Sequence, residues 1–113
     1  MTPQSAKSKG RTLQQWACAK ISELINLPWG HDCPIESRGM GQNGVDVRLD
    51  DKAIKLFPFS VECKNCERWN VPEWIEQAKT NQKHNTDWLL IAKKNHVQPV
   101  VIIDAEAFFR LLR

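Results

Sequence analysis

The sequence predicts an α/β protein in which a mixed central β-sheet is flanked by helices. Three observations favour this class. Apolar residues at helical spacing from about Thr12 to Leu27 predict one long amphipathic helix. Segments 88–92 and 100–103 are near-continuous apolar runs, which are typical of strands covered on both faces. Segments 45–49 and 59–64 show the apolar and polar alternation of further strands.

The other predicted elements complete the order helix, three strands, helix, two strands, helix. A short strand is predicted over 33–37, a helix from Pro72 to about His84, and a final amphipathic helix over 105–112. The strands on either side of the middle helix are expected to run parallel through a right-handed crossover. The first three strands can form an antiparallel meander. Three tryptophans are expected to face the core: Trp16, Trp74 and Trp88.

Length and composition bound the organisation of the chain. Its 113 residues suffice for one domain, and 42% hydrophobic and 26% charged residues are the balance of an ordinary soluble protein. Residues 1–10 are basic and lack the apolar stretch of a secretory signal. We therefore expect a flexible basic arm over 1–10, a single domain over 11–113 and a cytoplasmic location. No apolar run is long enough for a membrane span, and the net charge of +3 permits a nucleic-acid partner.

One predicted strand ends in side chains that can do chemistry. Because side chains alternate across a strand, Glu62 and Lys64 share one face, and Val61 and Cys63 share the other. Asp46 stands between two valines in an earlier predicted strand. If the two strands pair, Asp46 and Glu62 meet at one end of the sheet. Two carboxylates and the backbone carbonyl of Cys63 would then form an oxygen-rich site suited to Mg²⁺ or Mn²⁺.

Such a site suits the hydrolysis of a phosphodiester. A metal ion offsets the charge of the phosphate and acidifies a bound water, and the Lys64 ammonium supplies a cation near the nucleophile or the developing oxyanion. The alternative is a solvent-facing salt bridge between Glu62 and Lys64. A second triplet of this kind, Asp50-Asp51-Lys52, has no apolar strand around it, and we interpret it as a solvated turn.

These motifs and their order resemble the PD-(D/E)XK nuclease superfamily. The matching segments are GVDV with Asp46 and, 16 positions on, VECK with Glu62 and Lys64. The resemblance covers about Gly10 to Leu112 and is greatest to small Holliday-junction-resolvase-type endonucleases, including phage and archaeal ones. It implies a restriction-endonuclease-like core and a Mg²⁺- or Mn²⁺-dependent endonuclease that cuts DNA. In that enzyme Asp46 and Glu62 would be metal ligands and Lys64 the catalytic lysine.

The resemblance also implies roles for residues outside the motif. Gln77 matches a glutamine that many relatives carry in the helix after E-x-K. Archaeal relatives carry a glutamate in the first helix, at a place that holds Gln14 in this chain. Either Gln14 replaces the carboxylate, Glu23 serves from another turn as a catalytic residue, or the position is unused. Ser37 and Arg38 open a glycine-rich loop (37–44) where resolvases present polar residues to the phosphate backbone.

The expected partners are DNA, branched or duplex, and a second copy of the chain. Lys79 and Lys83 form a basic pair that can contact nucleic acid. Symmetric cutting of two strands needs two sites, which predicts a homodimer with twofold symmetry. A general or nicking duplex nuclease is one alternative function. A module of the same fold that binds nucleic acid without catalysis is another.

Zinc binding is an alternative chemistry. Cys63 and Cys66 form a C-x-x-C, and His31, Cys33 or Cys18 could complete a set of four ligands. The sequence has no second C-x-x-C or C-x-x-H, and the alternation of Cys63 with two polar residues favours a small core residue.

Overall fold

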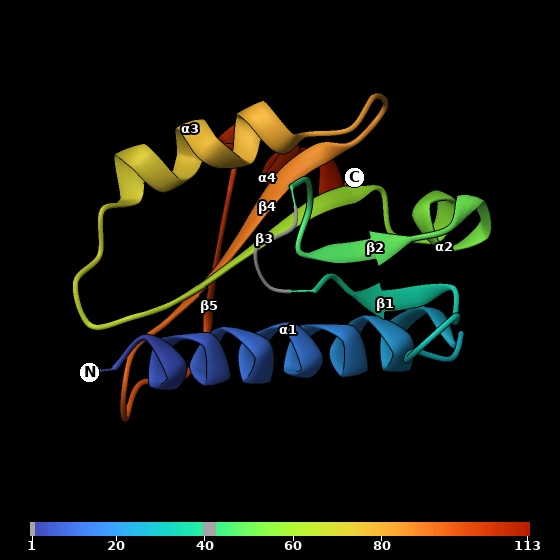
Figure 1. The fold of residues 1–113 in the computed structure, drawn as a ribbon. Helices are drawn as coiled ribbons and strands as arrows, with labels where there is room; N and C mark the ends of the chain where they lie inside the picture. Colours follow the sequence, from blue (N-terminus) through green and yellow to red (C-terminus); the bar gives the residue numbers. More distant parts are fainter. Residues whose placement is uncertain (1, 40–42) are drawn as a thin grey trace.

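The computed structural model describes residues 2–39 and 43–113, so residues 40–42 of the glycine-rich loop lie outside the described ranges. Its elements follow the order α1 (Pro3–Ile25), β1 (Ile35–Ser37), β2 (Val47–Leu49), α2 (Asp51–Leu56), β3 (Phe59–Asn65), α3 (Val71–Asn81), β4 (Asp87–Lys93), β5 (Val100–Ile103) and α4 (Ala105–Leu111). Strands β3, β4 and β5 form a mixed sheet, with β3 parallel and β5 antiparallel to β4. Helices α1 and α3 lie on opposite faces of this sheet (Figure 1). The predicted α/β class with a mixed sheet is confirmed.

Helix α1 begins earlier than the sequence predicts. The Thr2 hydroxyl caps its N-terminus by accepting a hydrogen bond from the Ser5 backbone N–H at 3.1 Å, and a proline occupies the first turn. The expectation of a flexible arm over 1–10 is therefore wrong for residues 3–10, which form the first turns of the helix. Gly10 costs about 1 kcal/mol in a helix interior, and the good helix formers around it offset that cost.

The predicted meander of three strands is only partly present. Strands β1 and β2 pair with each other, Ile35 opposite Leu49, in a two-stranded sheet of their own. Their link to β3 is the backbone N–H of Asp46, which donates to the carbonyl of Val61 at 2.9 Å. The chain turns away after β2 because Asp50 caps helix α2, its Oδ1 accepting from the Ala53 N–H at 2.8 Å. The predicted solvated turn at Asp50 is thus the start of a short helix.

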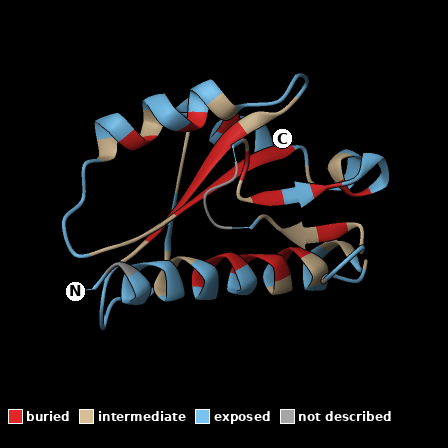
Figure 2. Cartoon of the chain, in the orientation of Figure 1, coloured by how far each residue is buried: buried red, intermediate tan, exposed pale blue. Residues whose placement is uncertain are grey.

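Two apolar clusters fill the two sides of the mixed sheet. On the α1 side, the buried side chains of Val61 and Cys63 pack with α1 and with the pair β1–β2. On the α3 side, Trp74 packs against Trp88 and Leu90. Figure 2 shows the buried residues gathered in β3, β4 and the sheet-facing stripe of α1. The expected alternation of β3 is confirmed, as is the burial of Trp74 and Trp88.

The C-terminal part of the fold is more exposed than its apolar sequence predicts. Strand β5 lies at the edge of the sheet, and Val101 is 56% exposed, so the expectation that both faces of 100–103 are covered is wrong. In α4 the buried residue is Ala107, whereas Phe109 is 62% exposed. Trp16, expected in the core, is 40% exposed. Despite these apolar surfaces, no helix within the described ranges is both long enough and apolar enough to cross a bilayer.

Candidate functional site

The residues singled out in the E-x-K motif lie together in one pocket. It has a volume of about 310 Å³ and lies where α1, β3 and α3 meet the segment that precedes β2. Its lining consists of Gly10, Gln14, Asn43, Gly44, Asp46, Glu62, Cys63, Lys64, Gln77 and Asn81. Polar side chains dominate this list, which is unusual for the interior of so small a protein and typical of a site that binds ions or polar ligands.

Asp46 is held against the edge of β3 that does not pair with β4. Its backbone N–H donates to the Val61 carbonyl, and its carboxylate Oδ2 accepts from the Cys63 N–H at 2.7 Å. In a strand, the N–H and C=O of one residue project from the same edge. The Cys63 carbonyl therefore lies on the same edge as Asp46, as its predicted role of metal ligand requires.

Glu62 and Lys64 project from β3 on the side of α3, and each is held by an amide of that helix. Asn81 Nδ2 donates to Glu62 Oε1 at 2.9 Å, and Lys64 Nζ donates to Gln77 Oε1 at 2.6 Å. Glu62 is only 3% exposed. The predicted salt bridge is not the arrangement found, since the ion pairs of the described residues do not join these two side chains.

The two contacts form because α3 runs antiparallel to β3 with a matching spacing. Gln77 and Asn81 are one helical turn apart, and four residues of helix rise about 6 Å. Glu62 and Lys64 are two residues apart on the strand, a distance of about 6.6 Å. The amide pair therefore faces the acid–lysine pair in register.

Burial makes both carboxyl groups harder to ionise, and the charge of Asp46 adds to the effect on Glu62. Burial, then the negative charge of Asp46, raises the pKa of Glu62 to about 7, against the lowering effects of Asn81 and Lys64. Burial also raises the pKa of Asp46, and the Cys63 N–H and Lys64 oppose that rise. Ionising the buried Glu62 beside the half-buried Asp46 is therefore costly.

The first helix contributes an amide to the pocket. Gln14 is 4% exposed, lines the pocket, and accepts a hydrogen bond from the Ser37 hydroxyl at 2.7 Å through its Oε1. Glu23 is exposed and lies nine residues further along α1, about 13 Å along the helix axis. Helical spacing therefore places Glu23 outside the pocket, apart from the other predicted site residues, and its catalytic role stays a prediction. Of the alternatives for this helix, Gln14 in place of a carboxylate fits the structure.

Ser37 and Arg38, expected to contact phosphate, make contacts within the protein. Besides the bond from Ser37 to Gln14, Arg38 Nε donates to the Val45 carbonyl at 2.6 Å. The guanidinium lies over Gly44, where an added Cβ would come within 3.3 Å of its Nη2 and where φ is +98°. Gly44 thus allows Arg38 to hold together the two ends of the glycine-rich loop. Phosphate binding by Ser37 and Arg38 stays a prediction.

Lys79 and Lys83 lie outside the lining of the pocket. The exposed Lys79 ammonium is 4.0 Å from the carboxylate of Glu76 on the same helix. Lys83 uses its backbone N–H to donate to the Ser60 hydroxyl at 2.9 Å, and its side chain is exposed. Their contact with nucleic acid also stays a prediction.

The thiols do not gather into a zinc site. Cys63 is buried in the core, and the Cys66 thiol donates to the carbonyl of Arg68. Burial raises the pKa of Cys18 to about 12 and also raises that of Cys63, so neither offers a thiolate at neutral pH. In the part of the chain that the structure describes, no cysteine belongs to a group of three possible metal ligands.

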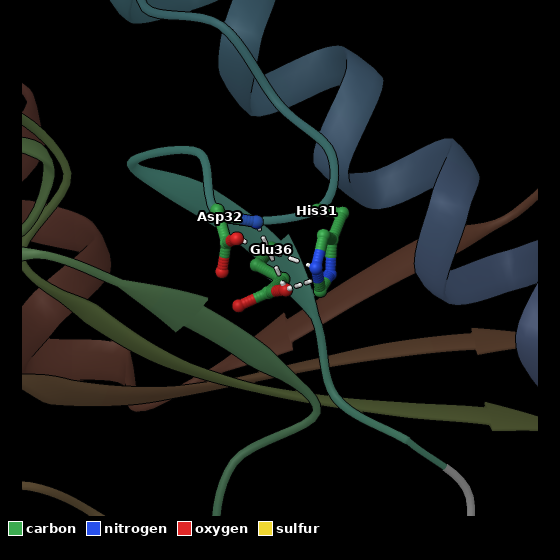
Figure 3. A group of neighbouring side chains, drawn as sticks. All are labelled: His31, Asp32 and Glu36. Atoms are coloured by element: carbon green, nitrogen blue, oxygen red, sulfur yellow. Dashed lines mark hydrogen bonds and ion pairs between the residues drawn. The ribbon is translucent and has the colours of Figure 1, made fainter.

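A separate cluster of possible ligands lies on the surface, formed by His31, Asp32 and Glu36 (Figure 3). The two imidazole nitrogens of His31 are 3.3 Å from Asp32 Oδ2 and 3.5 Å from Glu36 Oε2. Arg48 lies 3.4 Å from the other oxygen of Glu36. His31 and Asp32 are almost fully exposed. A surface ion-pair group accounts for these contacts without a metal.

Sequence reasoning missed Asn81, the residue that holds Glu62. The sequence feature that could have identified Asn81 is its position four residues after Gln77. This spacing places the two amide side chains on the same face of α3. With Asn81 included, side chains from three separate elements converge on the pocket with complementary charge and hydrogen bonding. Comparisons with protein-family models, with curated proteins and with solved structures found no significant match to this chain.

Proposed function

We propose that this protein is a metal-dependent endonuclease that hydrolyses phosphodiester bonds in DNA, with a core of the PD-(D/E)XK type. The observation that carries the proposal is the convergence of Asp46, Glu62 and Lys64 in one polar pocket. These residues come from separate parts of the sequence, and the fold brings them together with their side chains held by specific donors and acceptors.

The donor set fits Mg²⁺ or Mn²⁺. Both ions prefer oxygen ligands, and the carboxylates of Asp46 and Glu62 with the carbonyl of Cys63 supply three. Burial is the main cause of the raised pKa values of both carboxyl groups, and a cation bound between them would favour the ionised forms. When bound, such an ion would stabilise charge on the phosphate and lower the pKa of a coordinated water.

The protein's own side chains would orient the reacting groups. Asn81 donates to Glu62 Oε1, and the Glu62 and Asp46 carboxyl groups hydrogen-bond each other, so a cation would take the place of the proton that they share. Gln77 accepts a hydrogen bond from the Lys64 ammonium, which orients the other two N–H donors of the ammonium. Lys64 would therefore act as a fixed cation toward the phosphate oxygens rather than as a free general base.

We extend the proposal to a homodimer that selects branched DNA. Two strands are cut symmetrically when a twofold axis relates two identical sites. Exposed apolar residues support self-association: Val101 on β5, Phe109 on α4 and Leu112, directly after α4, are each more than half exposed. General duplex cleavage differs from this proposal in the substrate preference of the dimer, not in the chemistry of the pocket.

The test is cleavage of a labelled four-way junction, compared with a linear duplex and a single strand of the same sequence. Each substrate is incubated with Mg²⁺, with Mn²⁺ and with EDTA, using the wild type and Asp46→Asn. Paired, symmetric cuts in the junction with metal, absent in the variant, would support the proposal. Cleavage of all duplexes would remove the junction preference. Binding without cleavage under every condition would identify a nucleic-acid-binding module instead.

A further inference from the structure

The charges of the chain are divided between two ends of the fold. Three segments meet at the end where β3 and β4 finish: the start of α1 (3–11), the chain from β3 into α3 (64–73) and the turn after β4 (93–99). Asn65 Nδ2 donates to the Lys9 carbonyl at 3.0 Å, and the Cys66 N–H donates to the Lys93 carbonyl at 3.1 Å. Figure 1 shows the N-terminus of α1 beside the turn between β4 and β5 at this end.

We call these three segments the basic end. They contain seven basic and two acidic residues, a net charge of +5, while the rest of the chain contains nine basic and eleven acidic residues, a net charge of −2. The net charge of the whole chain is only +3 because the positive charge of the basic end is partly offset by the negative charge of the rest. The basic residues of this end are Lys7, Lys9, Arg11, Lys64, Arg68, Lys93 and Lys94.

The basic end is not arranged for the stability of the protein alone. None of its basic residues takes part in an ion pair within the described ranges. Helix α1 carries Lys7 and Lys9 in its N-terminal part and no acidic residue in its first turn, which is unfavourable toward the positive end of the helix dipole. The ammonium of Lys9 and the Oδ1 of Asn65 are buried and lack a hydrogen-bond partner among the described residues.

This end adjoins the candidate site. Lys7, Gly10 and Gln14 lie three and four residues apart on α1, so they share one face, and the last two line the pocket. Lys64, at the end of β3, belongs to both the pocket and the basic end. A phosphate chain that crosses the basic end would therefore lead directly to the carboxylate pair.

We propose that the basic end is the surface along which a DNA backbone approaches the pocket, and that Lys79 and Lys83 are not. The proposal rests on the proposed function, because it takes a phosphodiester as the substrate of the pocket. It assigns binding to contacts with phosphates, which are independent of base sequence and sensitive to salt. Lys83 instead lines a hollow with Glu36 and Asp50 outside the basic end, and Lys79 already faces Glu76.

The test compares two double variants that each remove two exposed positive charges. Lys7→Gln with Lys94→Gln changes the basic end, and Lys79→Gln with Lys83→Gln is the matched control. Binding of a labelled 30-base-pair duplex is followed by fluorescence anisotropy in EDTA, so that no metal-dependent cleavage occurs, across a series of NaCl concentrations. We expect the first pair to reduce the slope of log K against log [NaCl] by about 2 and to weaken binding about tenfold or more at 0.1 M NaCl. The control pair should change the slope by less than about 0.5.

A third variant, Lys7→Arg with Lys94→Arg, keeps the charge and should retain the wild-type slope. Equal losses in the two Gln pairs, or a loss only in the control pair, would overturn the proposal. So would binding to vesicles of anionic phospholipid together with no binding to the duplex. The proposed function fails separately: a wild type that never cleaves with Mg²⁺ or Mn²⁺, yet shows the expected slopes, would refute the nuclease and leave the surface in place.

Discussion

Glu62→Gln should make the metal-free protein more stable at pH 8 while it removes a metal ligand. The substitution keeps the size of the side chain and the oxygen that accepts a hydrogen bond from Asn81. It removes the negative charge of a residue that is only 3% exposed and lies beside Asp46. A buried carboxylate without a cation destabilises the fold, and its neutral amide counterpart does not.

The size of the effect follows from the pKa of Glu62, which rises from 4.5 to about 7 on folding. Between these values the folded protein binds more protons than the unfolded chain, so the stability of the wild type falls as pH rises through this window. At pH 8 ionised Glu62 costs about 3 kcal/mol, and at pH 5 the cost is below about 1 kcal/mol. Glu62→Gln should recover most of this difference.

The assay is urea unfolding in EDTA at pH 8 and pH 5. At pH 8 the midpoint of the variant should lie about 1–3 M above that of the wild type, and at pH 5 the two should nearly coincide. Glu76→Gln, on the exposed face of α3, is the matched control and should change stability by less than about 0.5 kcal/mol at both pH values. A destabilised Glu62→Gln at pH 8, or a gain of equal size at both pH values, would refute the reasoning.

Three further outcomes are expected. Asn81→Leu leaves the Glu62 carboxylate without its donor, so stability should fall by about 1–3 kcal/mol at pH 8 and by less at pH 5, measured by the same unfolding assay. Val61→Ala, in the buried α1-side core, should cost about 2–3 kcal/mol, whereas Val101→Ala on the exposed edge strand should cost less than about 0.5; similar losses would contradict the burial described here. Because Glu62, with its pKa of about 7, must lose its proton to bind a cation, Mn²⁺ affinity should fall below pH 7 and binding should release protons, which calorimetry in buffers of different ionisation enthalpy would detect.

The core of the candidate site was predictable from local pattern. Alternation along β3 separates Glu62 and Lys64 from Val61 and Cys63, and the structure keeps that separation. Asp46 meets β3 as expected, although through two hydrogen bonds at a strand edge rather than a regular ladder. The period of a strand is short enough that a few residues determine which face each side chain takes.

Long-range geometry explains what local pattern did not predict. Glu23 has the right chemistry for the site, but that it lies outside the pocket follows only from the way α1 is placed against β3. The apolar residues of β5 and α4 predicted that both elements are buried. Their burial, however, depends on whether another element of the fold covers them. Nothing local in the sequence shows that β5 is an edge strand.

The match between one turn of α3 and two residues of β3 determines where the chain can tolerate insertions. An extra residue in the 66–70 connection leaves the spacing inside α3 unchanged. An extra residue between Gln77 and Asn81 would turn one amide about 100° around the helix axis, so that Glu62 and Lys64 could not both keep their partners. Deletions within α3 would have the same consequence. In this small protein, the spacing inside one surface helix is as important to the pocket as the acidic residues themselves.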